Sequence, residues 1–254
     1  SDNYTNVATF FNQFLDDLNV DPTDDDLDDM QFDIHRLREL AVAGLTTFGP
    51  ADPNYTPNQE AEFNFMAGFS HLLAGELFKS LPAMPAGPVM SPTDHLNAAL
   101  RYFNDGLAVA TEPFTQASLQ LGIARAHYGL GNQSEAVTAA DAAIVLDPAF
   151  IRYANFDAVN GPTNTMQDGL WDRGSFDDLQ PLPRLDFLDP KYNGSNATQE
   201  FNAPILKIEE AHLILAEAAL ADEDLPTAQA VMLNIIGLVD TRPLASVPDG
   251  VEGR

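Results

Sequence analysis

The residues best suited to ligand chemistry cluster around the single tryptophan of the chain. Trp171 lies close in sequence to polar side chains that form several hydrogen bonds each: Asn164, Gln167, Asp168, Asp172 and Arg173. An aromatic ring covers the apolar C–H face of a sugar, while amides, carboxylates and guanidinium groups bind its hydroxyls. The cluster therefore predicts a carbohydrate-binding site. The sequence leaves one alternative open, in which Trp171 fills a helical core and its polar neighbours line a solvated loop.

The same region holds further aromatic candidates for a ligand site: Tyr153, Phe156 and Tyr192. Each is expected either at the rim of the site or in the core. The stretch from Phe150 to Phe201 has no sustained helical or strand period and is rich in Asn, Asp, Gly and Pro. Long irregular segments are uncommon in compact domains and are often functional. We therefore expect an irregular, ligand-facing segment at about residues 150–203.

Two acidic patterns resemble metal sites but lack required ligands. The run Asp21–Asp29 resembles a calcium loop, but Asp26 stands where the loop needs glycine and Phe32 where it needs glutamate. Glu209 and His212 form one Glu-x-x-His pattern, which is half of the pairing in di-iron helix bundles. No other histidine follows a glutamate at that spacing. We expect neither a metal site nor a cofactor.

The motifs of common catalytic sites are missing from the sequence. There is no cysteine, no Gly-x-Ser-x-Gly elbow and no phosphate-binding glycine loop. Paired carboxylates could hydrolyse glycosides, but among 38 acidic residues their presence carries no information. The sequence therefore predicts a protein that is not an enzyme.

The charge of the chain limits its partners. Its 254 residues include 12 Lys and Arg against 38 Asp and Glu, a formal net charge of −26. Such a surface repels phosphates, which argues against nucleic acid and anionic membranes. It suits either a salt-rich medium or an extracellular protein. No apolar run approaches the ~18 residues of a spanning helix, and Ser1 opens no basic leader, so we expect a soluble or mature chain.

Helical periodicity dominates on both sides of the irregular segment. An apolar stripe of Leu27, Met30, Ile34, Leu37 and Ala41 predicts a first helix. The second helix is expected from about Asn58 to Ser80, with Phe65, Phe69, Leu72, Leu73 and Leu77 facing inward. Prolines between Leu81 and Pro88 stop it, and Ser91-Pro92 predicts the N-cap of a third helix, which extends to about Ala110.

Two later helix pairs resemble tetratricopeptide repeats. Gln116–Pro148 contains two helices around a Gly-containing turn, with recurring alanines that allow close helix contact. Ile208–Ala221 and Leu225–Val239 form the second pair, whose turn lacks the glycine. Two units this far apart do not make a regular solenoid, which needs about three stacked repeats.

Three segments together resemble the SusD/RagB family of nutrient-binding surface lipoproteins. The first, Gln59–Pro82, is similar to an early helix of the family but lacks the glycine of its final turn. The second, Leu182–Tyr192, is similar to the stretch before the late helices. The third and most specific is Ala203–Ala218, where Glu210 and Glu217 match two glutamates of a family helix.

This resemblance implies an all-α fold, with tetratricopeptide-like helix pairs in an α-α superhelix and a long irregular aromatic-containing insertion. It implies one domain over residues 1–254, with helix pairs at about 58–148 and 205–240. Family members capture oligosaccharides or other oligomeric nutrients for a TonB-dependent transporter, on the extracellular face of the outer membrane. They normally carry a lipidated cysteine, and this chain has none.

Other classes of function remain open from the sequence. One is a tetratricopeptide-type scaffold that binds a peptide or protein subunit in a helical groove. Another is an acidic subunit of an extracellular assembly, which would self-associate. A secreted location is the alternative to the outer membrane.

Overall fold

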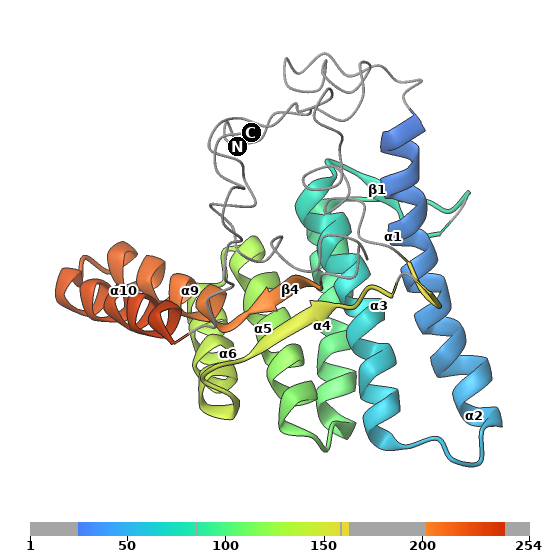
Figure 1. Cartoon of the computed structure of the whole chain (residues 1–254). Coiled ribbons are helices and arrows are strands. Elements are labelled where there is room, and N and C mark those ends of the chain that lie inside the picture. Colours follow the sequence, from blue (N-terminus) through green and yellow to red (C-terminus); the bar gives the residue numbers. More distant parts are fainter. Residues whose placement is uncertain (1–24, 85, 158, 163–201, 242–254) are drawn as a thin grey trace, which may run out of the picture. The chain divides into compact units, whose positions relative to one another are not determined.

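The computed structural model describes residues 25–84, 86–157, 159–162 and 202–241 (Figure 1). The helices are α1 (Asp25–Ala43), the π-helix η2 (Gly44–Phe48), α2 (Gly49–Ala51), α3 (Pro57–Leu77), α4 (Pro92–Val109), α5 (Pro113–Leu130), α6 (Gln133–Leu146), α9 (Ile208–Ala221) and α10 (Leu225–Asp240). The strands are β1 (Leu81–Pro82), β2 (Val89–Met90), β3 (Ile151–Ala154) and β4 (Ala203–Lys207). The fold is all-α with packed helix pairs, as the sequence predicts.

The chain divides into two compact units. The helical unit comprises Asp29–Arg152 and Leu206–Thr241, and the other unit comprises Ser1–Asp28, Tyr153–Ile205 and Arg242–Arg254. Most described residues belong to the helical unit. The single domain expected over residues 1–254 stays a prediction.

Local capping explains where helices α3 and α4 begin. The Thr56 hydroxyl accepts a hydrogen bond from the Gln59 N–H (3.2 Å), and the Gln59 side chain accepts one from the Thr56 N–H (2.8 Å). Ser91 and Asp94 form the same reciprocal box at the start of α4, with Pro92 at its first position. These bonds satisfy backbone N–H groups that have no partner inside a helix. The predicted N-cap at Ser91 is confirmed.

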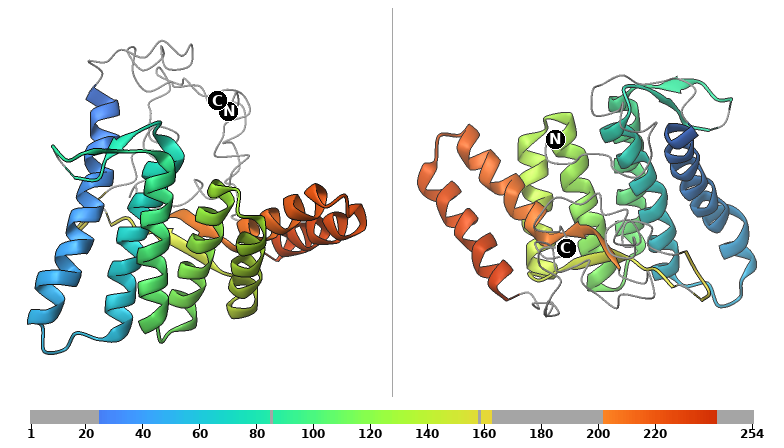
Figure 2. Two further views of the ribbon diagram at one scale, coloured as in Figure 1. Left: turned by 180° about the vertical axis from the view of Figure 1, so that it is seen from behind. Right: turned by 45° about the horizontal axis from the view of Figure 1, so that its top comes forward.

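Within the helical unit, the described helices form three consecutive pairs: α3–α4, α5–α6 and α9–α10. Helix α4 packs on α5, and α6 packs on α9, so each pair contacts the next (Figures 1 and 2). The two repeat-like units recognised in the sequence are therefore adjacent in space, and α3–α4 adds a third pair. This number of stacked pairs meets the requirement for a stable repeat array.

One phenylalanine explains the close approach of three helices. A Cβ on Gly68 of α3 would lie 2.6 Å from the Phe103 ring of α4, and a Cβ on Gly122 of α5 would lie 2.7 Å from it. Phe103 is fully buried and its ring centroid is 6.1 Å from that of Phe65. The two glycines thus create the space that this ring fills between α3, α4 and α5.

Several local expectations are wrong. The sequence marked Leu81–Pro88 only as a helix stop, but its first residues form β1, which pairs antiparallel with β2 (Leu81 opposite Met90). The family-like segment Ala203–Ala218 begins as strand β4, whereas helix α9 occupies Ile208–Ala221, the bounds that the sequence predicts. Leu77 and Met30, expected to face inward, are 55% and 39% exposed. Leu77 is the last residue of α3.

Candidate functional site

Helices α3, α5 and α9 share one polar face, which we call the α3–α5–α9 face. On α3, Glu62 and Glu76 are fourteen residues apart, and on α5, Ser118 and Arg125 are seven apart. Both spacings place the two residues on the same side of their helix. Arg125 binds Glu76 of α3 (2.6 Å) and Glu210 of α9 (3.1 Å). One guanidinium therefore connects all three helices.

The charges around Arg125 shift each other's protonation. Burial lowers the pKa of Arg125, but hydrogen bonds and attraction from Glu76 and Glu210 outweigh burial and raise it overall. Burial, helped by the nearby Glu76, raises the pKa of Glu210, although Arg125 opposes this. The Lys207 N–H also donates to Glu210 Oε1 (2.9 Å), at the point where β4 becomes α9. The cluster fixes the start of α9 on the array.

Strands β3 and β4 form a two-stranded sheet, which we call the stem. At its base, Arg152 pairs with the Glu62 carboxylate through both terminal nitrogens and donates to Ser118 Oγ (3.0 Å). The Arg152 guanidinium also lies 3.9 Å from the Phe65 ring centroid. Arg152 is 7% exposed, whereas the Glu62 side chain is 31% exposed, so water reaches the ion pair only from the Glu62 side. These contacts bind the base of the stem to the α3–α5–α9 face.

Apolar contacts reinforce this attachment within the helical unit. Phe150 is 1% exposed, and its ring centroid lies 5.2 Å from that of Phe114 on α5. Leu206 and Ile208 are fully buried, and the Ile208 N–H donates to the Phe150 carbonyl (3.0 Å). Both ends of the insertion between α6 and α9 are thus anchored side by side.

Beyond the stem, the described residues of the other unit show a closed turn. The Phe156 N–H donates to the Asn202 side chain (3.0 Å), which joins the two ends of the insertion again. The Asp157 carboxylate accepts from the N–H groups of Asn160 (3.0 Å) and Val159 (2.8 Å). These bonds lower the pKa of Asp157. The two ends of the insertion, at Phe156 and Asn202, therefore lie next to each other.

Of the predicted ligand-binding residues, the structure describes one. Tyr153 lies in β3 and is 44% exposed, so its ring is accessible. The others lie outside the described residues: Asn164, Gln167, Asp168, Trp171, Asp172, Arg173 and Tyr192. Phe156, a further candidate, is partly buried. The structure therefore neither brings the predicted cluster together nor separates it.

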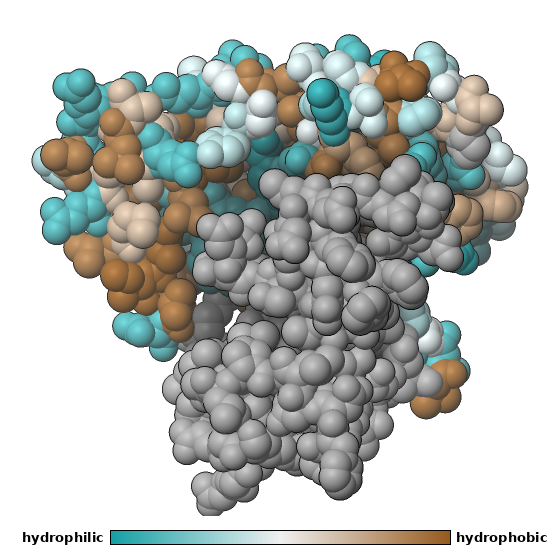
Figure 3. Space-filling model, turned by 90° about the horizontal axis from the view of Figure 1, so that it is seen from above, coloured by the Kyte–Doolittle hydropathy of each residue, from teal (hydrophilic) through white to brown (hydrophobic). Residues whose placement is uncertain are grey.

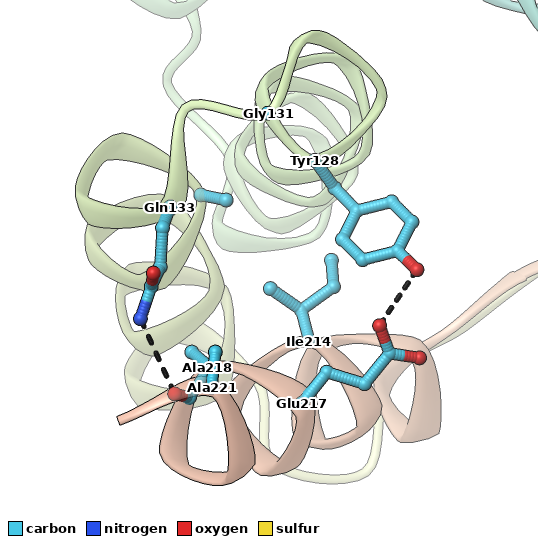
Figure 4. Close-up of a pocket in the computed structure, with 8 residues that line it drawn as sticks. Tyr128, Gly131, Gln133, Ile214, Glu217, Ala218 and Ala221 are labelled. Carbon is cyan, nitrogen blue, oxygen red and sulfur yellow. Dashed lines mark hydrogen bonds between the residues drawn. The ribbon is translucent and has the colours of Figure 1, made fainter. Parts of the chain in front are cut away.

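A small pocket lies between the α5–α6 turn and α9 (Figure 4). Its volume is about 180 Å³, roughly the size of one large side chain. Tyr128 Oη donates to Glu217 (2.7 Å), and Gln133 Nε2 donates to the Ala218 carbonyl (3.2 Å). The bond to Glu217 raises the pKa of Tyr128. These polar groups already form hydrogen bonds within the chain. The pocket is therefore a packing gap between helix pairs, and these groups are not free to bind a ligand.

A buried histidine cluster is the feature that sequence reasoning missed most completely. The His71 and His95 Nδ1 atoms are 2.9 Å apart, and His95 Nε2 lies 2.8 Å from the Leu81 carbonyl. His95 must donate to that carbonyl, so its Nδ1 accepts from His71. Nearby, Arg38 is 4% exposed and binds His35. His35 and Arg38 are three residues apart on α1, but no spacing rule links them to His71 of α3 or His95 of α4.

Metal binding finds no support among the residues that the structure describes. No group of three or more His, Cys, Asp or Glu side chains is placed there to hold a metal ion. His212 Nδ1 is buried without a hydrogen-bond partner, and burial lowers the pKa of His212. Of the calcium-like run, Asp25–Asp29 belongs to α1, and its earlier residues lie outside the described part.

Two comparisons, with protein-family models and with curated proteins, find no match. None of the described helices is both long and apolar enough to span a membrane. The class of the protein must therefore be inferred from its own residues.

Proposed function

We propose that the chain is a non-catalytic binding protein of the SusD/RagB type. It captures an oligosaccharide or another oligomeric nutrient outside the cell and passes it to a TonB-dependent transporter in the outer membrane. Its place is the extracellular face of that membrane, with secretion as the alternative. The stacked helix pairs are the frame, and the insertion between β3 and β4 holds the ligand.

One observation carries this proposal: both ends of the insertion are anchored on the helical frame. Arg152 joins the outgoing strand β3 to α3 and α5 through Glu62 and Ser118. The returning strand β4 is held by Leu206, whose side chain is fully buried. A binding segment needs rigid support, because loosely held side chains lose entropy when they order around a ligand. The stem supplies that support to a segment whose sequence is rich in aromatic and hydrogen-bonding residues.

The same anchoring disfavours the rival scaffold function. A tetratricopeptide-type scaffold needs an open helical groove for its peptide. Here Phe65 and Ser118 of the α3–α5–α9 face are buried, and Arg152 of strand β3 supplies the contacts to them. A peptide would have to displace the stem and leave the Glu62 carboxylate without its cation.

Charge is compatible with a neutral ligand. A net charge of −26 repels anionic ligands, whereas an uncharged sugar experiences no such repulsion. Sugar recognition depends on ring stacking and hydrogen bonds. Those interactions do not weaken with salt as ion pairs do.

Binding to a glycan array, followed by calorimetry on the best ligand, tests the proposal. Trp171→Ala is expected to weaken binding about tenfold, the effect of losing one to two kcal/mol of aromatic stacking. Phe48→Ala is the matched control, because Phe48 is an aromatic residue, 64% exposed, on η2 and outside the insertion. A full glycan panel without binding, or equal affinities for the two variants, would refute the site.

Transfer to a transporter needs its own experiment. The chain should co-purify with a TonB-dependent transporter from detergent-solubilised outer membranes. A gene for such a transporter beside the gene for this chain would support the pairing. Recovery of peptide ligands instead would favour the scaffold.

A further inference from the structure

Helix α10 carries an exposed apolar surface beside the face that packs on α9. Its inner face packs against α9 and includes Ala228, which is 5% exposed. The outer face, which we call the α10 stripe, carries apolar side chains with exposures from 43% (Met232) to 64% (Leu225). Its members are Leu225, Met232, Leu233, Ile236 and Val239.

The spacing of these residues defines a continuous surface. Leu225, Met232, Ile236 and Val239 follow one another at intervals of seven, four and three residues, which fall on one side of an α-helix. Leu233 lies at the edge of the same side. Figure 3 shows hydrophobic side chains gathered at the left of the molecule, the end where α9 and α10 lie. A contiguous apolar surface of this kind marks an interaction site.

The stripe is unusual because the rest of the chain is so acidic. Asp240, the last residue of α10, is the only charged residue of the helix, although the chain contains 38 Asp and Glu. The outer side of a surface helix is ordinarily polar. Exposed apolar side chains this numerous on one helix indicate a surface that a partner covers.

We propose that the α10 stripe binds the α10 stripe of a second copy of this chain. The two helices pack antiparallel about a two-fold axis near Met232, so that Leu225 of each copy lies near Val239 of the other. An uncharged stripe is complementary to itself, which is what a two-fold interface requires. The contact continues the existing array, because it adds one more helix layer to α10.

The size of the surface predicts a weak dimer. From their exposures, the five side chains offer roughly 500 Å² per copy, or about 1,000 Å² in the pair, near the lower limit for specific interfaces. In the antiparallel arrangement, the acidic Asp222–Asp224 turn of one copy approaches Asp240 of the other. This repulsion is screened by salt, so dimerisation should strengthen as salt rises.

Sedimentation equilibrium of the full chain, from about 1 to 200 µM in low and in molar NaCl, tests the proposal. We expect a dimer whose population rises with the protein concentration and with the NaCl concentration. Ile236→Glu should weaken it at least tenfold. Val145→Glu, at an 84% exposed apolar site on α6, is the matched control and should leave it unchanged. Because both sites are exposed, both variants should keep the wild-type circular dichroism melt.

Cross-linking identifies the geometry independently. The chain has no cysteine, so Met232→Cys should form a disulfide-linked dimer under mild oxidation, whereas Val145→Cys should not. A monomer at every concentration and salt, or a dimer that Ile236→Glu does not weaken, would overturn the proposal. Both measurements are made without ligand, so their outcome is separate from that of the proposed function.

Discussion

The buried histidines should make the protein sensitive to mild acid. Burial, together with the positive charge of Arg38 and the neighbouring His95, lowers the pKa of His71 from 6.5 to about 3. His71 is therefore neutral in the folded protein and becomes charged below pH 6.5 only when the chain unfolds. The unfolded state binds the extra proton, so the free energy of unfolding falls as the pH drops below 6.5.

The size of this effect follows from the difference between the two pKa values. At about 1.4 kcal/mol per pH unit, His71 alone removes about 2 kcal/mol of stability between pH 7 and pH 5. The loss would continue until the pH approaches 3. Burial lowers the pKa values of His35 and His95 as well, so their contributions have the same sign.

Urea unfolding at pH 7, 6 and 5, at constant ionic strength, measures this loss. Most carboxylates stay ionised above pH 5, so repulsion among the acidic residues changes little between pH 7 and pH 5. The change in stability over this range therefore reports mainly on the histidines. In His71→Gln the amide can still donate to His95 but does not titrate, and the pH dependence should flatten by about 2 kcal/mol. His127→Gln, at a partly exposed site, is the control and should flatten it less.

The result that would refute the reasoning is specific. If wild type and His71→Gln lose the same free energy between pH 7 and pH 5, His71 takes up no proton on unfolding. The cluster of His71, His95, Arg38 and His35 would then be open to water in solution, contrary to its burial here. A stability that rises toward pH 5 in both proteins would show that charge repulsion outweighs the histidines.

Two further changes test the frame. Arg152→Met leaves the Glu62 carboxylate without its cation and should cost about 3 kcal/mol in urea unfolding, while the double variant with Glu62→Gln should recover part of that loss. An unchanged midpoint for Arg152→Met would show that the stem is not held by this pair. Gly131 ends α5 at φ 74°, where a side chain is strained, so Gly131→Ala should cost about 1 kcal/mol and Gly131→Asn less. Equal losses for Ala and Asn in the same assay would contradict this origin.

Much of the helical framework was predictable from local sequence patterns. The Ser91-Pro92 signal placed the start of α4, because capping depends only on residues within one turn. The burial of Phe65 and Phe69 followed from the helical period of apolar residues. The end of α3 was less accurate, since the helix ends at Leu77 rather than at Ser80 and Leu77 is exposed.

For the candidate site, the sequence predicted the residue types but not how they are arranged. The aromatic and polar content of residues 150–203 pointed to a ligand-facing segment, but nothing local indicated that its ends pair as β3 and β4. That pairing needs backbone hydrogen bonds between segments far apart in the chain, and strands this short carry little period of their own. The anchor Arg152 was missed for the same reason, since its partners Glu62 and Ser118 come from distant helices.

The sequence by itself determined the helical class, the helix starts and the acidic, cysteine-free chemistry, because each depends on residue type or on neighbours within a turn. Tertiary structure decided that α6 packs directly on α9, that the histidines meet in the interior, and that one side of α10 stays uncovered. Each of these depends on which surfaces meet once the chain folds back on itself. Burial and close packing, rather than spacing along the chain, select those partners.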